Sequence, residues 1–238
     1  CAASPDIGAM SGYLTAEETQ ALLLSLRVSF VAVAVALPFA LATALLLSRR
    51  NFPGKLLIDG IVHVPLVLPP VAMGYLLLIA LGTRAPLGAW LLAHFGLRFV
   101  FSWTGAALAA AIITFPFQVR GIRLSLESID KGLHDAARTL GAGALDRFIN
   151  ITLPLALPGI VAVAITAFAA SLGEFGAIIT FVSNIPGETR TLPLAIYTAL
   201  QTPGGEAEAA RLAALSIALA LVFMTIAEYA ARRARTKP

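Results

Sequence analysis

Long apolar stretches separated by short polar segments form the dominant pattern of this chain. A helix needs about 20 apolar residues to cross roughly 30 Å of hydrocarbon. Three stretches close to that length carry no charged residue: 28–47, 101–119 and 151–173. Two further stretches are long enough: residues 56–81, with Asp59 and His63 near the start, and residues 212–231. The five stretches are numbered in chain order. The pattern therefore predicts five transmembrane helices.

A further apolar segment, residues 191–200, is too short to cross a membrane alone. Turn-forming residues flank it, with Pro186 and Gly187 before it and Pro203 and Gly204 after it. Two interpretations remain open. The segment is a half-helix that dips in from outside, where its N-terminus would favour an anion, or a loop that contacts a partner protein. The predicted fold class is an all-α membrane protein, a bundle of five transmembrane helices or six counting this segment as re-entrant.

Prolines interrupt the second apolar stretch. Pro65, Pro69 and Pro70 lie close together and Gly74 follows them. Proline removes a backbone donor and bends or ends a helix. The group therefore marks either a broken helix whose freed backbone lines a cavity or a packing kink in a continuous one.

Basic residues predict the orientation of the chain in the membrane. Lys and Arg in short loops stay on the cytoplasmic side, and here they cluster after the first, third and fifth apolar stretches. The clusters are Arg49, Arg50 and Lys55; Arg120, Arg123, Lys131, Arg138 and Arg147; and Arg232, Arg233, Arg235 and Lys237. This distribution puts the N-terminus outside and the C-terminus inside. Residues 1–18 then form an outside tail, and residues 19–238 form a single membrane domain.

Composition agrees with a membrane protein and narrows the functional classes. Hydrophobic residues make up 58% of the chain and charged residues 13%, and the mean hydropathy is +0.86, which differs from soluble domains. The net charge of +4 does not indicate nucleic-acid binding, because membrane topology already explains where the basic residues lie. Cys1 is the only cysteine, so no disulfide or cysteine-based zinc site can form within one chain.

The sequence carries no recognisable catalytic motif. A phosphate-binding loop of the form GxxxxGK[ST] is absent, as are HExxH and GxSxG. The three histidines, His63, His94 and His134, are far apart in the sequence. We therefore expect no enzymatic activity, no metal site and no cofactor on this chain.

The cytoplasmic loop of residues 124–153 contains a short amphipathic helix. Apolar residues recur at i, i+3, i+4 and i+7, an α-helical spacing, and are Leu133, Ala136, Ala137 and Leu140. Asp130 is placed to cap the helix and Gly141 to end it. Such a helix either docks on a cytoplasmic partner or lies on the membrane surface.

This loop resembles the EAA loop of bacterial ABC importer permeases. Asp135, Ala136 and Ala137 are followed after three residues by Gly141, and Ile151, Leu153 and Pro154 complete the pattern. Asp135 stands where the family has glutamate, which keeps the charge and shortens the side chain. The segments SLGEFGAIITFVSNIPGETRTLPLAIYTALQTPGGE at 171–206 and HVPLVLPPVAMGYLLL at 63–78 resemble the molybdate permease branch.

The resemblance implies an assembly and a location. In that family two permease copies form the pathway in the cytoplasmic (inner) membrane of a bacterium or archaeon. Two separate ATPase chains, which bind ATP and Mg, dock on the EAA loops, and a periplasmic or extracellular binding protein delivers molybdate, with tungstate as an alternative cargo. The coupling residues implied here are Leu133, Asp135, Ala136, Ala137, Leu140, Gly141, Ile151, Leu153 and Pro154.

Candidate pathway residues lie on and just beyond the fourth predicted span. Ser171, Thr180, Ser183 and Asn184 offer neutral hydrogen-bonding groups to an oxyanion, and Glu174 is a charge within an apolar region. A carboxylate would repel a dianion, so we expect Glu174 in the water-accessible outer part of the span rather than on the route or at an interface between copies. Glu188 and Arg190 are expected as exposed charges that contact the binding protein or face solvent.

Three other functions fit parts of the pattern. A sulfate or thiosulfate permease would share size, loop and mechanism. A secondary transporter driven by an ion gradient would show inverted repeats and several intramembrane ionisable residues, whereas Glu174 is the one clear candidate here. A membrane scaffold would lack conduction altogether. The EAA-like loop favours an importer over the last two.

Overall fold

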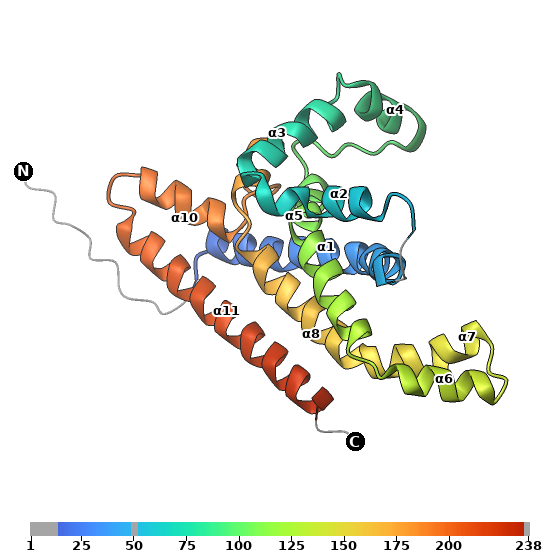
Figure 1. Cartoon of the computed structure of the whole chain (residues 1–238). Coiled ribbons are helices and arrows are strands. Elements are labelled where there is room, and N and C mark those ends of the chain that lie inside the picture. The colour runs from blue at the N-terminus through green and yellow to red at the C-terminus, as the bar shows by residue number, and fades with distance from the viewer. Residues whose placement is uncertain (1–13, 49–51, 236–238) are drawn as a thin grey trace, which may run out of the picture.

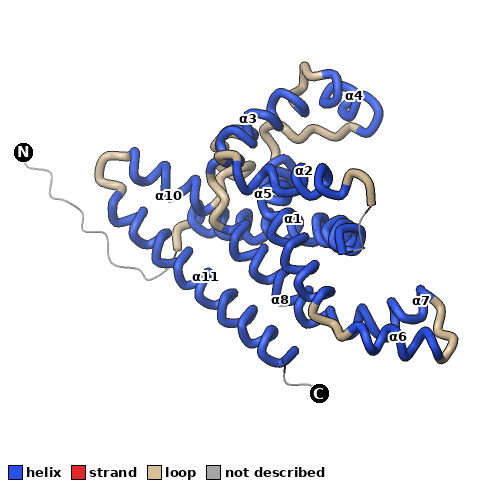
Figure 2. Tube along the Cα trace, in the orientation of Figure 1, coloured by secondary structure: helices blue, strands red, loops and turns tan. Residues whose placement is uncertain are grey.

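The computed structural model describes residues 14–48 and 52–235, and within these ranges the regular secondary structure is helical (Figures 1 and 2). Four long helices are α1 (Ala16–Ser48), α5 (Trp103–Glu127), α8 (Leu153–Leu172) and α11 (Glu206–Arg235). By length and composition, four helical segments of the described chain are able to cross a membrane, or five if one bent pair is counted as a span. The predicted all-α membrane bundle is confirmed. Because α1 begins at Ala16, the last residues of the predicted tail belong to a helix, while residues 1–13 lie outside the described part.

Small side chains let the central helices approach closely. Ala32 and Ala36 of α1 are buried in one core with Ala106 and Ala110 of α5. Without large side chains between them, backbones pack tightly, which is the usual way that helices associate in membranes. At the opposite end of the bundle α5 also contacts α8, where a Cβ on Gly159 would come within 2.2 Å of the Ser125 hydroxyl oxygen.

The predicted span over residues 56–81 is broken into two helices. α2 (Lys55–Val67) and α3 (Pro70–Leu81) meet at an angle of 114°. Leu68 and Pro69 between them have extended ψ angles of 140° and 136°. A residue that precedes proline disfavours the helical region, so the Pro69-Pro70 pair ends α2 and starts α3. The structure supports a broken helix rather than a kink.

A second break lies between α8 and α9 (Gly176–Val182), and α9 packs against α3. Two glycines make this crossing close. A Cβ on Gly74 would lie 2.6 Å from the Ala177 carbonyl oxygen, and one on Gly176 would lie 2.9 Å from the Pro70 Cβ. The two interrupted helical segments therefore contact each other directly.

Two shorter helices complete the outer connections. α4 (Pro86–Phe95) lies in the loop between α3 and α5, and α10 (Leu192–Gln201) packs against α11 and α1. α10 buries Leu192, Leu194 and Ala199, so the segment predicted at residues 191–200 is a packed helix that begins at Leu192 and ends at Gln201. This finding excludes the interpretation of that segment as a simple loop.

The predicted cytoplasmic loop forms a helical hairpin that projects from the ends of α5 and α8 (Figure 1). Its arms are α6 (Lys131–Thr139) and α7 (Ala144–Arg147), and a π-helical turn, η1 (Phe148–Thr152), joins α7 to α8. Residues Ala144–Leu172 form one continuous span of helix.

Candidate functional site

The helix predicted in the cytoplasmic loop is present and capped at both ends. The Asp130 carboxylate accepts a hydrogen bond of 2.9 Å from the Gly132 amide. At the other end Gly141 has a φ of 86°, its amide donates to the Arg138 carbonyl, and the next amide donates to the Ala137 carbonyl. This double hydrogen bond is the Schellman arrangement, which fixes the direction in which the chain leaves a helix. The predicted roles of Asp130 and Gly141 as cap and terminator are confirmed.

The apolar side of α6 has no cover within the described chain. Leu133 is 47% exposed and Leu140 is 88% exposed. Ala136 is exposed between them, Ala137 is half-buried, and Asp135 is an exposed neighbour. Apolar side chains that gather on a projecting element mark a site of interaction with another protein or with a membrane.

The return arm anchors this surface in the membrane bundle. Leu153 packs against the inner core that α1, α5 and α8 share. Ile151 lies half-buried in the π-helical turn, and Pro154 follows that turn as the second residue of α8. The Arg147 guanidinium donates to the Ala142 carbonyl across the end of the hairpin at 2.6 Å. The predicted coupling residues thus lie on the hairpin and on the start of α8, and the exposed apolar side chains of Leu133 and Leu140 lie on the first arm of the hairpin and at its turn.

Glu174 is buried, which corrects the expectation that water surrounds it. Its side chain is 8% exposed and lies at the break between α8 and α9. Oε1 accepts a 2.8 Å hydrogen bond from the Ala177 amide. The carboxylate therefore stabilises the first turn of α9, where the free amides and helix dipole favour negative charge. Sequence alone missed this role because it depends on the break in the helix.

Ser171 and Thr180 differ in how free their hydroxyls are. Ser171 is 2% exposed, and its hydroxyl has no hydrogen-bond partner among the described residues. The Thr180 hydroxyl donates to the Gly176 carbonyl at 2.8 Å within α9. Of these two candidates Ser171 keeps an uncommitted donor, and Thr180 makes the local bond that is common for hydroxyls in membrane helices.

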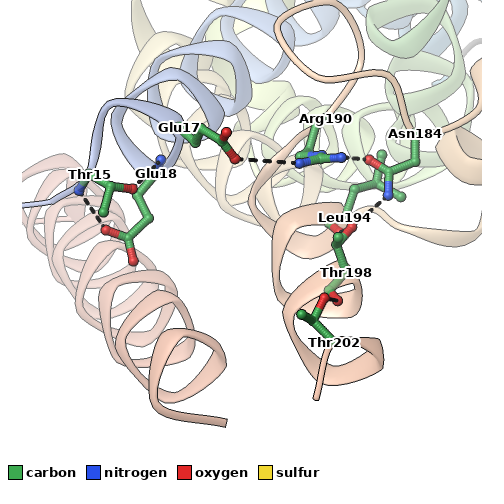
Figure 3. A network of polar contacts seen from close by, with 8 residues as sticks. All are labelled: Thr15, Glu17, Glu18, Asn184, Arg190, Leu194, Thr198 and Thr202. Carbon is green, nitrogen blue, oxygen red and sulfur yellow. Dashed lines mark hydrogen bonds and ion pairs between the residues drawn. The ribbon is translucent and has the colours of Figure 1, made fainter. Parts of the chain in front are cut away.

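Asn184 and Arg190, predicted for different roles, bond to each other (Figure 3). The Arg190 Nε donates to the Asn184 Oδ1 at 3.0 Å, and the Asn184 amide donates to the Thr198 hydroxyl of α10 at 2.7 Å. Arg190 also lies 3.8 Å from Glu17, and its side chain is only 21% exposed. Arg190 is therefore part of an internal network, which corrects its placement as an exposed charge.

Ser183 and Glu188 lie in the same connection between α9 and α10. Ser183 is exposed and has a φ of 67°, a backbone conformation that non-glycine residues rarely adopt. Glu188 is exposed as predicted. The segment between them is held by Thr189, whose hydroxyl donates to the Ser183 carbonyl and accepts from the Ile185 amide.

Sequence reasoning missed a buried carboxylate in the first turn of α1. Glu18 is 1% exposed; its Oε2 accepts from the Thr15 amide, and its Oε1 accepts from Arg211 of α11. Thr15 in turn accepts from the Glu18 amide. This reciprocal pair is a capping box, and the pattern Thr-x-x-Glu before an apolar run is a signal that could have found it.

The described residues show no group of three or more His, Cys, Asp or Glu side chains able to hold a metal ion. The described residues form a bundle of apolar helices from which one hairpin projects, an architecture suited to a membrane subunit that contacts a partner outside the bilayer. Comparison with known proteins agrees. Residues 21–236 match the family of binding-protein-dependent transport system inner membrane components, and the chain belongs to this family.

Relatives within this family share most of the chain. The chain is 58% identical over 224 residues to the molybdenum transport system permease protein ModB of Escherichia coli (strain K12), covering 94% of this chain and 98% of that one. It is 53% identical over 220 residues to ModB of Haemophilus influenzae, covering 92% and 96%. Identity to the sulfate transport system permease protein CysT of Escherichia coli (strain K12) is 34% over 198 residues, covering 82% and 71%.

The fold is also found in solved structures. The MetNI methionine ABC transporter, in inward-facing conformations, matches with a TM-score of 0.71 at 16% identity, covering 93% of this chain and 99% of that chain. At this identity the match concerns the fold alone. It is an inner-membrane multi-pass permease fold, as the apolar helices also indicate.

Proposed function

We propose that this chain is the permease subunit of an ATP-driven importer that moves molybdate, with tungstate as a second cargo, into the cytoplasm. The observation that carries the proposal is the 58% identity to a molybdenum transport permease over 94% of the chain. The sulfate permease relative is more distant, at 34%. The EAA-like loop and its exposed hairpin support the ATP-driven mechanism.

We infer the partners of the chain from the same proposed function. Two copies of the chain enclose the pathway, and two separate ATPase chains, each binding ATP and Mg, dock on the hairpins. A periplasmic binding protein delivers the anion on the face opposite the hairpin. The N-terminus then lies outside and the C-terminus inside. This chain supplies the membrane pathway and the mechanical link, and hydrolysis takes place on its partner.

The hairpin is suited to transmit force. Leu133, Ala136, Ala137 and Leu140 present an apolar surface for a groove on the ATPase, and small side chains allow a close approach of the two backbones. The hairpin is joined to the bundle by unbroken helix, because residues Ala144–Leu172 form one helical span. Movement of the ATPase chains would therefore displace α5 and α8 and switch the pathway between outward and inward access.

The pathway is proposed to run beside the contact between the two broken segments. Membrane helices that are interrupted expose backbone groups which can replace water around an ion. Ser171 adds a buried hydroxyl without a partner among the described residues. A neutral donor suits a dianion better than a fixed charge, because the anion must also leave.

Uptake into proteoliposomes tests this function. The chain, its ATPase and its binding protein are reconstituted, and labelled molybdate is offered with tungstate or sulfate as competitor. The proposal expects uptake that requires ATP and is blocked by tungstate and not by sulfate. Equal competition by sulfate would place the chain with sulfate permeases. Uptake without ATP would contradict an ATP-driven importer.

A further inference from the structure

A cluster of ionisable side chains joins α2 to the end of α5 that leads into the hairpin. The Arg123 Nε donates to Glu127 Oε1 at 2.7 Å on the same helix. The Arg123 Nη1 lies 3.7 Å from Asp59 Oδ1 of α2. His63 Nδ1 lies 2.7 Å from the Asp59 carbonyl oxygen and 3.4 Å from Asp59 Oδ1. One guanidinium is thus placed between two carboxylates from different helices.

The two carboxylates share this guanidinium unequally. Glu127 receives a short hydrogen bond, whereas Asp59 Oδ1 is buried and has no hydrogen-bond partner among the described residues. A buried acceptor without a partner destabilises the state in which it occurs. A displacement of about 1 Å between α2 and α5 would bring Asp59 within the usual length of an N–H···O bond.

The surroundings leave room for such a displacement. Every residue of α2 is at least partly exposed, and its main packing partner is α5. Ile58 and Val62 rest on the inner core as partly buried side chains. A cavity of about 250 Å³ borders Asp59, His63, Arg123 and Glu127. Because no residue of α2 is fully buried, a small movement of α2 lets the guanidinium change partners without opening the inner core.

The cluster also lies between the hairpin and the broken helical segment α2–α3. The last five residues of α5 run from Arg123 to Glu127, and Asp130 then caps α6 of the hairpin. On the other side, α2 leads to the 114° bend and to the contact of α3 with α9. Asp59 and Arg123 therefore form an ionic link between the helix that enters the hairpin and the interrupted helical segment.

We propose that Arg123 is a positioning residue that exchanges between Glu127 and Asp59 during transport and so passes movement of α5 to α2. This inference rests on the proposed function, since it assumes that the hairpin is driven by an ATPase. The structure has the Glu127-bound arrangement. The alternative arrangement pairs Arg123 with Asp59 and satisfies the buried Oδ1.

Two isosteric variants separate the two arrangements. Asp59→Asn removes the second carboxylate and should hold Arg123 on Glu127. Glu127→Gln weakens the first bond and should move Arg123 to Asp59. Nitroxide labels at positions 57 and 117, in a Cys1→Ser background, report the separation of α2 and α5, because Leu57 and Phe117 are 68% and 51% exposed. The complete transporter is used in lipid, with and without nucleotide.

In the resting state the distance between α2 and α5 should be unchanged in Asp59→Asn, which keeps the Glu127-bound arrangement, and shorter in Glu127→Gln, in which Arg123 moves to Asp59. Both variants should respond less to nucleotide than the wild type. Molybdate taken up per ATP hydrolysed should fall roughly tenfold in Asp59→Asn, while hydrolysis continues. Glu228→Gln is the matched control, because Glu228 also pairs with an arginine four residues away, on α11. It should leave the ratio unchanged.

An unchanged resting distance in Glu127→Gln, or an unchanged ratio of uptake to hydrolysis in Asp59→Asn, would overturn the exchange of partners. These outcomes are distinct from failure of the proposed function. If the wild-type transporter shows no ATP-dependent uptake, the proposed function fails, whereas the distances between α2 and α5 are measured without any cargo.

Discussion

Glu18 and Arg211 are 193 residues apart in the sequence, yet Glu18 Oε1 accepts a 2.9 Å hydrogen bond from Arg211 Nη2. The pair joins the first turn of α1 to the first turns of α11. Glu18 is 1% exposed and Arg211 is 56% exposed, so the bond reaches from the interior to the surface. Nearby, the buried Ser25 hydroxyl accepts from the Leu192 amide of α10 at 2.7 Å. The start of α1 thus holds both members of the α10–α11 hairpin.

Replacing Glu18 with Ala should destabilise this end of the bundle. The Thr15 amide and Arg211 would both lose their acceptor, and loss of a helix-capping interaction costs about 0.5–2 kcal/mol. Thermal unfolding of the purified chain in detergent measures the effect. Glu17→Ala is the control, because Glu17 is 79% exposed and its contact with Arg190 is 3.8 Å long. Equal loss in both variants would contradict the importance of the buried bond.

Gly141→Ala should weaken the hairpin. Gly141 has a φ of 86°, and an L-residue in this left-handed region costs about 1–2 kcal/mol. We expect a less ordered end of α6 and a lower ratio of uptake to ATP hydrolysis in the reconstituted transporter. Gly143→Ala provides a close comparison, since Gly143 has a φ of −66° and its Cβ would meet no atom within 4 Å. A full coupling ratio in Gly141→Ala would count against a rigid hairpin.

Leu140→Ser tests the docking surface itself. Leu140 is 88% exposed, so the substitution removes apolar area without opening a cavity in the bundle. Co-purification with the ATPase should decrease by roughly tenfold, as expected when a central apolar contact is lost. Leu200→Ser on α10 is the control, because Leu200 is 64% exposed and remote from the hairpin in sequence. If both variants retain the ATPase equally, α6 is not the docking element.

Gly74→Ala tests the contact between α3 and α9. The new Cβ would lie 2.6 Å from the Ala177 carbonyl oxygen, which is backbone and cannot rotate away. Overpacking of this kind costs about 1–3 kcal/mol, and we expect a lower unfolding temperature together with slower uptake. Gly60→Ala on α2 should instead be neutral or stabilising by about 0.5–1 kcal/mol, because its Cβ meets nothing within 4 Å. A normal unfolding temperature for Gly74→Ala would show that the crossing can relax.

The long helices could be predicted because the bilayer dictates their length and composition. Residues 28–47, 101–119 and 151–173 lack charges, and each lies in or largely coincides with a long helix of the structure. The caps of α6 were also readable, since Asp130 and Gly141 act on neighbouring amides and carbonyls. These features depend on local sequence and on the solvent, and a pattern along the chain contains both.

The direction of the break after Val67 could not be read from the prolines alone. Pro69 and Pro70 forbid a regular helix, but the 114° angle depends on the packing of α3 against α9. Burial of Glu174 likewise depends on where α8 ends, and the partners of Arg190 lie on α1 and before α10. Contacts between distant segments decide these positions, and no spacing in the sequence reports them.

The close contact between α5 and α8 fixes the two helices to each other at one point, and both continue from there toward the hairpin. A Cβ on Gly121 would lie 2.4 Å from a methyl group of Val163, and one on Gly159 would meet Ser125, so the helices have no slack where they touch. From Gly121 to the end of α5 the lever is roughly 9 Å long, at 1.5 Å per residue. In the proposed mechanism, a force on the hairpin would therefore tilt α5 and α8 about this contact, because the two helices cannot move closer together there.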